Sequence, residues 1–373
     1  MKPLRKIGVI SILFTILLTL SLSQAVQAAG VTTTITVGSV PYGVAYDPNT
    51  NEIYVANHGS NTVTVISDQT NKVVKTVTVK SHPSGVAYDS GTNEIFVANY
   101  DDNSVSVISE SNYKVVYTIT VGSNPWGIAY DSALGKIFVT NHYGNTVSII
   151  SDSTHEVVET VNVGTYPAGI AYDSGKNEVF VANNDDNTVS VISDSTNKVV
   201  KLISSGSTPS GVAYDSALGE IFVANQARNT VSVISDVTNE TIETIAVGAD
   251  PTGIAYDSGM GQIFVTNQND HSVSVISDST NEVVENITVG YSPLFLCYDS
   301  GKSMVFVANA GAGSVSLVSD SANTSVSPSP TVPEFSFAGL ISLFALMVAV
   351  TIGTVAVIER KSKKRAWCIE FSP

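Results

Sequence analysis

The chain has 373 residues, of which 43% are hydrophobic and only 14% charged, so it is long enough to bury a large apolar core. Between a basic leader and a basic tail lie 10 of its 18 basic residues and 31 of its 33 acidic ones, a net charge of about −21. A polyanion of this kind repels nucleic acid, so we expect no nucleic-acid partner.

Residues 1–28 have the pattern of a secretory signal peptide. Lys2, Arg5 and Lys6 precede an apolar run over residues 7–22, and small residues lead up to Ala28, where we expect cleavage. The alternative is a retained N-terminal anchor.

Seven copies of one 42-residue unit fill residues 29–320. The copies follow the consensus P-x-G-[VI]-A-Y-D, then I-[YF]-V-[AT]-N, then T-V-S-V-I-S-D, then K-V-V-x-T-V-T-V, with turn residues between the runs. Four short strands in a unit of about 40 to 50 residues are typical of a β-propeller blade. The prolines that open the units are Pro41, Pro83, Pro125, Pro167, Pro209, Pro251 and Pro293. The sequence therefore predicts an all-β, seven-bladed β-propeller of four-stranded blades.

The four runs of a unit predict their own depth in the blade. The first (43–46 in the first unit) is rich in small residues, as an inner strand crowded by its neighbours requires. The second (53–56) is apolar throughout and should be covered on both faces. The third (62–67) and fourth (73–79) alternate Val or Ile with Thr or Ser, so we expect both nearer to solvent and the fourth outermost.

The ring is predicted to close through its N-terminal strand. A fourth run follows each third run except the last, at 314–319, which leads into a linker. The missing copy lies at the other end of the domain, where residues 34–38 align with residues 118–122. We therefore expect this strand to complete the last blade, which leaves no free sheet edge at the seam.

The second run carries a resemblance. Residues 53–57 (I-Y-V-A-N) and 137–141 (I-F-V-T-N) resemble the YVTN-type propeller repeat of archaeal surface-layer-like proteins, although no copy spells Y-V-T-N in full. The resemblance implies a propeller at the cell surface. It does not imply a particular reaction, because one fold hosts many functions.

The C-terminal residues predict a membrane tether. A Pro/Ser linker (321–334) precedes 24 uncharged residues (335–358), enough at about 1.5 Å each to cross a hydrocarbon core of about 30 Å as a transmembrane helix. The basic tail (359–373) should stay in the cytoplasm and leave the propeller outside, anchored to the cytoplasmic membrane. Cys297 and Cys368 lie on opposite sides of this span, so we expect no disulfide between them.

Pro333, Glu334 and Phe335, followed by the apolar run and the basic cluster, resemble the archaeal PEF-type C-terminal sorting signal. That resemblance implies cleavage near the motif and replacement of the helix by a lipid anchor. Residues 366–373 extend beyond the pattern. The alternative is an ordinary stop-transfer helix, and both interpretations tether the protein to the outer face.

One face of the ring is expected to bind a partner. The loops before the first strand and between the second and third strands share this face and differ from blade to blade, whereas the opposite face repeats Asp- and Ser-rich turns. We call it the variable face. Aromatic side chains there offer contact area at little entropic cost, and the alternative is drift in unconstrained loops. The candidate binding residues are Tyr42, His58, Tyr100, Asp101, Asp102, Trp126, His142, Tyr143, Asp185, Asp186 and Arg228.

No metal, cofactor or catalytic residue is predicted. His58, His82 and His142 share the variable face and imidazoles bind zinc or copper, but no carboxylate accompanies each one. The pairs Asp101–Asp102 and Asp185–Asp186 each offer two of the six to eight oxygens that Ca²⁺ needs, so solvated loop charge is favoured. No Ser-His-Asp set, phosphate-binding Gly loop or C-x-x-C motif is found.

Two repeated features remain. A tyrosine recurs in every first run and predicts a structural layer, because a sevenfold residue follows the fold; these are Tyr46, Tyr88, Tyr130, Tyr172, Tyr214, Tyr256 and Tyr298. Three sequons make Asn239, Asn286 and Asn323 candidate glycan acceptors in a secreted chain.

The sequence thus favours a surface-anchored, non-enzymatic propeller that acts in envelope structure, adhesion or recognition. Its partners would be cell-envelope components, other surface proteins or glycans. The alternative is an extracellular propeller enzyme of the lactonase or lyase type, with a metal at the mouth of the channel. Such an enzyme needs several ligands that point inward from different blades.

Overall fold

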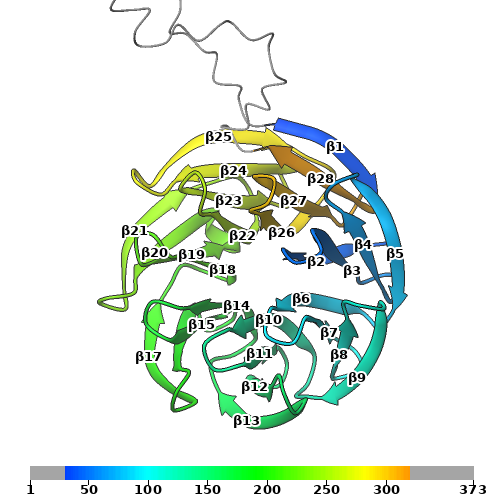
Figure 1. Cartoon of the computed structure of the whole chain (residues 1–373). Coiled ribbons are helices and arrows are strands. Elements are labelled where there is room, and N and C mark those ends of the chain that lie inside the picture. Colours follow the sequence, from blue (N-terminus) through cyan, green and yellow to red (C-terminus); the bar gives the residue numbers. More distant parts are fainter. Residues whose placement is uncertain (1–29, 320–373) are drawn as a thin grey trace, which may run out of the picture. The chain divides into compact units, whose positions relative to one another are not determined.

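Each repeat folds into an antiparallel sheet because its strands are short, rich in Val, Ile and Thr, and separated by turn residues. The computed structural model describes residues 30–319, in which 28 strands form seven four-stranded sheets around a central axis (Figure 1). The predicted all-β, seven-bladed propeller is confirmed.

Every blade has one strand of each kind, from the axis outward. The inner strands are β2 (Pro41–Asp47), β6 (Pro83–Asp89), β10 (Pro125–Asp131), β14 (Pro167–Asp173), β18 (Pro209–Asp215), β22 (Pro251–Asp257) and β26 (Pro293–Asp299). The second strands are β3 (Glu52–Asn57), β7 (Glu94–Asn99), β11 (Lys136–Asn141), β15 (Glu178–Asn183), β19 (Glu220–Asn225), β23 (Gln262–Asn267) and β27 (Met304–Asn309). The third strands are β4 (Thr62–Ser67), β8 (Ser104–Ser109), β12 (Thr146–Ser151), β16 (Thr188–Ser193), β20 (Thr230–Ser235), β24 (Ser272–Ser277) and β28 (Ser314–Ser319). The outer strands are β5 (Lys72–Thr78), β9 (Lys114–Thr120), β13 (Glu156–Asn162), β17 (Lys198–Ser204), β21 (Glu240–Ala246), β25 (Glu282–Thr288) and β1 (Gly30–Thr36), and a short 3-10 helix, η1 (Gln226–Arg228), follows β19.

The predicted closure is confirmed. Strand β1, blue in Figure 1, lies beside the orange β28, and the last sheet has the order β1-β28-β27-β26. The pairing is antiparallel, with Ile35 opposite Val315 and a register shift between Val31 and Thr33. The first strand of the domain therefore completes its last blade.

The core lies between blades. Each of seven apolar clusters joins side chains of two adjacent blades; in one of them Tyr54 and Val63 of the first blade pack against Ile95 and Val97 of the second. Every second strand contributes one fully buried aromatic ring, namely Tyr54, Phe96, Phe138, Phe180, Phe222, Phe264 and Phe306. Burying one such side chain stabilises the fold by about 1.5–3 kcal/mol. Neighbouring blades thus depend on each other for their burial.

The predicted exposure of the third strands is wrong. The middle residues of these strands are buried like those of the second strands, and only the outer strands face solvent. The alternating hydroxyls of the third strands form hydrogen bonds inside the blade: Asn57 Nδ2 donates to Thr64 Oγ1 (2.8 Å) and Asn99 Nδ2 donates to Ser106 Oγ (3.0 Å). Buried polar groups are tolerated when they are paired in this way.

The inner strands approach one another at a repeated glycine. A Cβ added to Gly127 would lie 2.5 Å from the backbone oxygen of Ala168 in the next blade, so no side chain fits there. The seventh blade departs from this rule, because Phe295 occupies the equivalent position and its ring lines the channel, 5.8 Å from the ring of Tyr42. The last blade thus carries an aromatic ring where the other six inner strands carry glycine.

The predicted signal peptide, linker, membrane segment and basic tail lie outside the described residues, as do Asn323, Pro333, Glu334 and Phe335. Within residues 30–319 no helix has the length and apolar character needed to cross a membrane.

Candidate functional site

Two sets of loops form the variable face, as predicted. In each blade, the loop after the second strand is held to the loop before the first strand by a backbone hydrogen bond. The N–H of His58 donates to the oxygen of Val40 (2.9 Å), and the N–H of His142 donates to that of Asn124 (2.9 Å). The repeated backbone thus holds variable side chains at fixed positions around the opening.

A cavity of about 550 Å³ opens at the centre of this face. Of the predicted residues, Tyr42, Trp126 and His142 line it. Its wall is completed by Val40, Ala168, Asn184, Ser210, Gln226, Thr252, Gln268, Ser292, Leu294, Ala310 and Gly311. A smaller cavity of about 160 Å³ lies in the channel between the inner strands, and Trp126 lines both cavities. We call the wider cavity the mouth.

Aromatic rings gather on the side of the mouth formed by the first three blades. Trp126 is the centre of this group. Its ring centroid lies 5.3 Å from that of His142 in a stacked arrangement, 5.3 Å from that of Tyr42 edge to face, and 5.4 Å from that of Tyr100. We call this group the aromatic cluster, and its members are Tyr42, His58, His82, Tyr100, Trp126, His142, Tyr143 and Tyr166.

The cluster is more buried than the sequence predicts. Tyr42 and Trp126 were expected to be exposed, but both are half-buried against their neighbours, whereas Tyr143 is 56% exposed. Burial raises the pKa of Tyr42 to about 12. Trp126 Nε1 is shielded from solvent and has no hydrogen-bond acceptor among the described residues. A buried donor without a partner costs about 1–3 kcal/mol.

The two histidines of the candidate set are held neutral. Burial lowers the pKa of both His58 and His142, and the neighbouring His82 lowers that of His58 further. The Nδ1 atoms lie 3.3 Å and 3.2 Å from the backbone oxygens of Pro83 and Pro167. Because a carbonyl oxygen only accepts, Nδ1 carries the proton and Nε2 is left as an acceptor.

Several candidate acidic residues brace the loops. Asp102 accepts a hydrogen bond from the backbone N–H of Ser81 (2.5 Å), and Asp186 accepts one from Thr165 (2.6 Å) at the same offset in the repeat. Asp101 pairs with His82 Nδ1 (2.6 Å). Asp185 and Arg228 are exposed. Within residues 30–319 no group of three or more His, Cys, Asp or Glu side chains could hold a metal ion.

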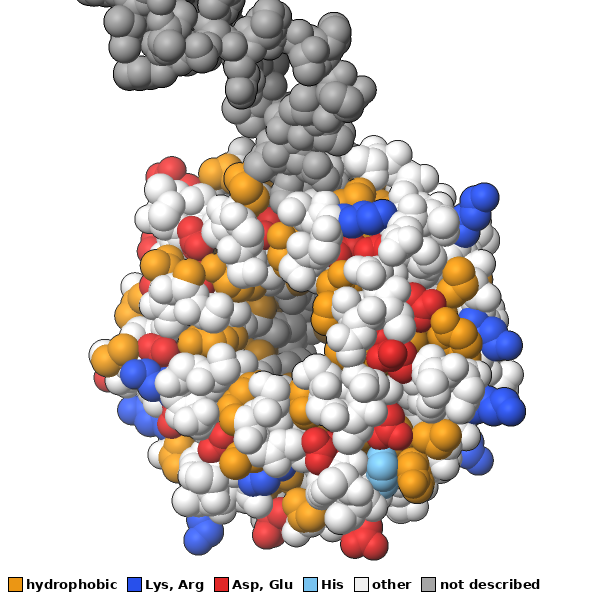
Figure 2. Space-filling model, in the orientation of Figure 1, with side chains coloured by type: hydrophobic (Ala, Val, Ile, Leu, Met, Phe, Trp, Pro, Cys, Tyr) orange, Lys and Arg blue, Asp and Glu red, His pale blue; other side chains and the backbone are white. Residues whose placement is uncertain are grey.

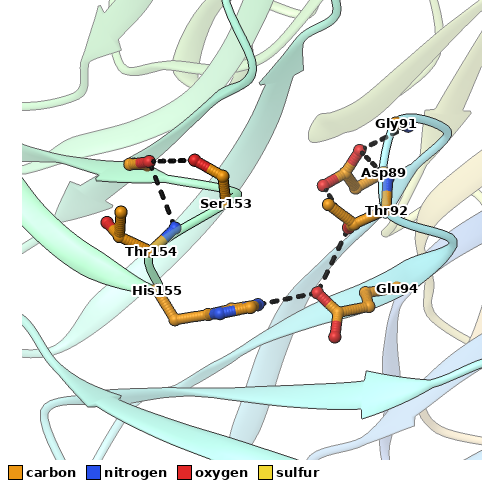
Figure 3. A network of polar contacts seen from close by, with 8 residues as sticks. Asp89, Gly91, Thr92, Glu94, Ser153, Thr154 and His155 are labelled. Atoms are coloured by element: carbon orange, nitrogen blue, oxygen red, sulfur yellow. Dashed lines mark hydrogen bonds and ion pairs between the residues drawn. The ribbon is translucent and has the colours of Figure 1, made fainter.

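The opposite face holds polar contacts between blades that sequence reasoning missed. His155 Nε2 lies 2.7 Å from Glu94 Oε2 of the preceding blade, and both side chains are largely buried (Figure 3). Thr92 Oγ1 lies within hydrogen-bond distance of Glu94 Oε2 (3.1 Å) and Asp89 Oδ2 (2.7 Å). A repeated spacing of 61 residues could have revealed these contacts in the sequence, because it separates the partners of each pair. The pairs are His155 and Glu94, Tyr113 and Glu52, Asn197 and Lys136, and Asn239 and Glu178.

Acidic side chains also meet between blades. Asp131 is fully buried, and its Oδ1 accepts hydrogen bonds from the N–H groups of Ala133 (2.9 Å) and Leu134 (3.1 Å), while Oδ2 has no partner among the described residues. Burial, and next the charge of Asp131, raise the pKa of Asp194, one and a half repeats further along. The equivalent pairs are Asp47–Glu110, Asp89–Asp152, Asp173–Asp236, Asp215–Asp278 and Asp299–Asp68.

The repeated tyrosines lie at these junctions. An atom at the Cβ position of Gly91 would lie 2.7 Å from the hydroxyl of Tyr130, 3.2 Å from Asp89 Oδ1 and 3.5 Å from Asp152 Oδ2. This placement accords with the structural layer that we predicted. In Figure 2 the acidic side chains are spread around one end of the ring and form no single patch.

Two sequons fall within the described residues. Asn239 Nδ2 donates to Glu178 Oε2 (3.4 Å), so its amide is engaged between blades. Asn286 is exposed on β25, and its Oδ1 accepts a hydrogen bond from Ser274 (2.7 Å). Glycan attachment at both positions stays a prediction.

The fold and the mouth define a class: a seven-bladed β-propeller with an aromatic-lined opening at one end. A solved structure of hydrazine synthase from Kuenenia stuttgartiensis is similar, with a TM-score of 0.69 and 18% sequence identity over 77% of this chain and 97% of that chain. At this identity the likeness shows the fold alone. No protein-family model and no curated protein matches the sequence.

Proposed function

We propose that this propeller is a non-enzymatic binding module of the cell surface, which recognises its partner through the variable face. The observation that carries the proposal is the aromatic cluster beside the mouth. Aromatic side chains dominate binding energetics when they lie in central, well-packed positions, as Trp126 does among Tyr42, Tyr100 and His142.

The asymmetry between the blades supports this proposal. The residue after the opening proline is aromatic in the first and third blades and small, hydroxylated or aliphatic in the others, although the backbone is the same. The fold therefore does not require a ring at that position. Contact with a partner would explain why aromatic rings occur at this position in only two blades.

The location is part of the proposal and rests on the sequence. The signal peptide, the YVTN-type resemblance and the C-terminal segments, including the sorting-signal resemblance, support a chain that is exported and anchored outside the cell. Partners there would be cell-envelope components, other surface proteins or glycans.

The alternative, an enzyme with a metal at the mouth, needs several ligands from different blades. The channel wall instead consists mainly of glycines and aliphatic side chains, with Trp126 and Phe295. Among the side chains of residues 30–319, no three His, Cys, Asp or Glu lie where they could hold a metal ion together. These observations favour binding over catalysis.

The test is attachment of the full-length protein to envelopes isolated from its native cell. Trp126→Ala and Tyr143→Ala should each weaken attachment, by about 2 kcal/mol for a true anchor residue. Tyr117→Ala is the matched control, because Tyr117 is an exposed aromatic residue on the outer strand β9. Equal losses in the control, or unchanged attachment in both variants of the cluster, would show that the variable face does not carry binding.

A further inference from the structure

The mouth has two chemically distinct sides. The first three blades contribute aromatic rings, of which Tyr42, Trp126 and His142 line the cavity. The fourth, fifth and sixth blades contribute amides and hydroxyls at the equivalent positions, namely Asn184, Gln226, Gln268, Ser210 and Thr252. A ligand in the mouth would therefore meet aromatic faces on one side and neutral hydrogen-bonding groups on the other.

The polar side is ordered by contacts among its own members. Asn184 Nδ2 donates to the backbone oxygen of Pro209 (3.1 Å), and Gln268 Nε2 donates to Ser292 Oγ (3.1 Å). Gln226 Nε2 lies 3.5 Å from Thr252 Oγ1. A side-chain amide has two donor hydrogens and two acceptor lone pairs, so these contacts fix the amides and leave them capacity for a ligand.

Formal charge is missing from the wall. None of the residues that line the mouth is Asp, Glu, Lys or Arg, and burial lowers the pKa of His142, the one imidazole that lines it. Ionic ligands bind where opposite charges or paired donors compensate their desolvation. The wall has no such group, so an uncharged ligand fits it better than an anion or a cation.

We propose that the mouth binds a neutral saccharide. The CH-rich face of a sugar ring would pack on Trp126 and Tyr42, while its hydroxyls would exchange hydrogen bonds with Asn184, Gln226 and Gln268. The cavity of about 550 Å³ lies within the range of about 300–1,000 Å³ of small-ligand sites. This inference rests on the proposed function and names the class of ligand.

The experiment screens the full-length protein against an array of neutral oligosaccharides of hexose, deoxyhexose and N-acetylhexosamine units, together with sialylated and sulfated counterparts. Neutral glycans should bind, and added charge should not improve binding. Their affinity should stay constant between about 0.05 and 0.5 M NaCl, because no ionised group of the wall takes part.

Variants locate the binding. Gln226→Ala and Gln268→Ala should each lower the affinity for the best glycan by about tenfold or more, as loss of one well-placed hydrogen bond does, and leave the melting temperature unchanged. The matched control is Gln69→Ala, an exposed amide in a turn of the opposite face, which should bind like the wild type.

Two results would overturn the saccharide inference and leave the proposed function standing. In the first, no neutral glycan binds although envelopes still capture the protein through Trp126. In the second, only charged glycans bind. A third result, in which envelopes and glycans both fail to bind, would overturn the proposed function as well.

Discussion

At the scale of single residues, the paired carboxylates between blades link stability to pH. Asp278 faces Asp215, and burial first, then that charge, raise its pKa. Tyr256 and Glu220 also face this pair. A carboxyl whose pKa is raised on folding stabilises the native state fully below its unfolded pKa of about 3.9. That stabilisation is lost as the pH rises through the folded pKa.

Asp278→Asn should therefore raise the melting temperature at pH 7 and have little effect near pH 4. Each 1 kcal/mol gained corresponds to about 1.5–2 °C in a domain of this size. Thermal melts of both proteins between pH 4 and 8 measure the difference, and Asp185→Asn in an exposed loop is the control. A variant that melts below the wild type at pH 7 would contradict the expected repulsion.

The neutral histidines of the variable face change stability with pH in the opposite direction to the paired carboxylates. The lowered pKa of His58 and His142 gives stability that is present above their unfolded pKa of about 6.5 and is lost as the pH falls through the folded value. Because Asp278→Asn leaves both histidines in place, the difference between the two melting curves isolates the carboxylate pair.

Individual residues also show where sequence reasoning fell short. The local pattern could not reveal that Asp102 caps the N–H of Ser81, because the pair is 21 residues apart. The alternating hydroxyls of the third strands imitate a solvent-facing strand, and their Asn partners lie seven residues earlier. Tyr42 was expected to be exposed because its neighbours Trp126 and His58 come from distant runs. Each miss concerns a contact between different strands or loops, which the residue pattern along one strand does not show.

At the scale of elements, the sequence predicted much more. The strands could be recognised in the sequence because the same apolar runs recur in seven copies. Counting the outer runs then predicted that β1 pairs with β28. The burial of the third strands could not be predicted in this way. It depends on how closely adjacent blades pack, which is set by side chains such as Val65 of the first blade and Ile95 of the second, which lie in one apolar cluster across the interface.

Deleting residues 31–37 should destabilise the ring severely. The deletion removes the buried Ile35, worth about 1.5–3 kcal/mol, and leaves the N–H and C=O groups of β28 unpaired along an edge that invites association. Domains are stable by only about 5–15 kcal/mol. We expect a lower melting temperature and self-association, measured by calorimetry and size-exclusion chromatography.

Point variants and a second deletion sharpen this test. Ile35→Ala should cost about 2–5 kcal/mol, whereas Thr34→Ala, at an exposed position of the same strand, should be nearly silent. Removing seven residues of the linker, 324–330, should also be silent. A monomeric deletion variant of 31–37 that melts with the wild type would mean that β1 does not support the last blade.

At the scale of the whole molecule, the described blades bury their apolar side chains against one another. All seven sheets and their clusters are complete within residues 30–319. A chain that ends at Ser325 should therefore be secreted as a soluble, folded monomer with the melting temperature of the full-length propeller. Circular dichroism and light scattering of the purified chain measure this, and recovery only as aggregate would show that the ring depends on the C-terminal segments.

The seam also determines how the last strand of the ring would resist a pulling force. Strand β28 ends at Ser319 and is the third strand of its blade, paired on one side with β27 and on the other with β1. A pull on the chain beyond Ser319 therefore meets two ladders of hydrogen bonds at once, whereas an edge strand would peel from one. Swapping the seam so that the chain left from an outer strand would lower the rupture force. A pull on the last strand of the ring is thus resisted on both sides, because β1 closes the last blade.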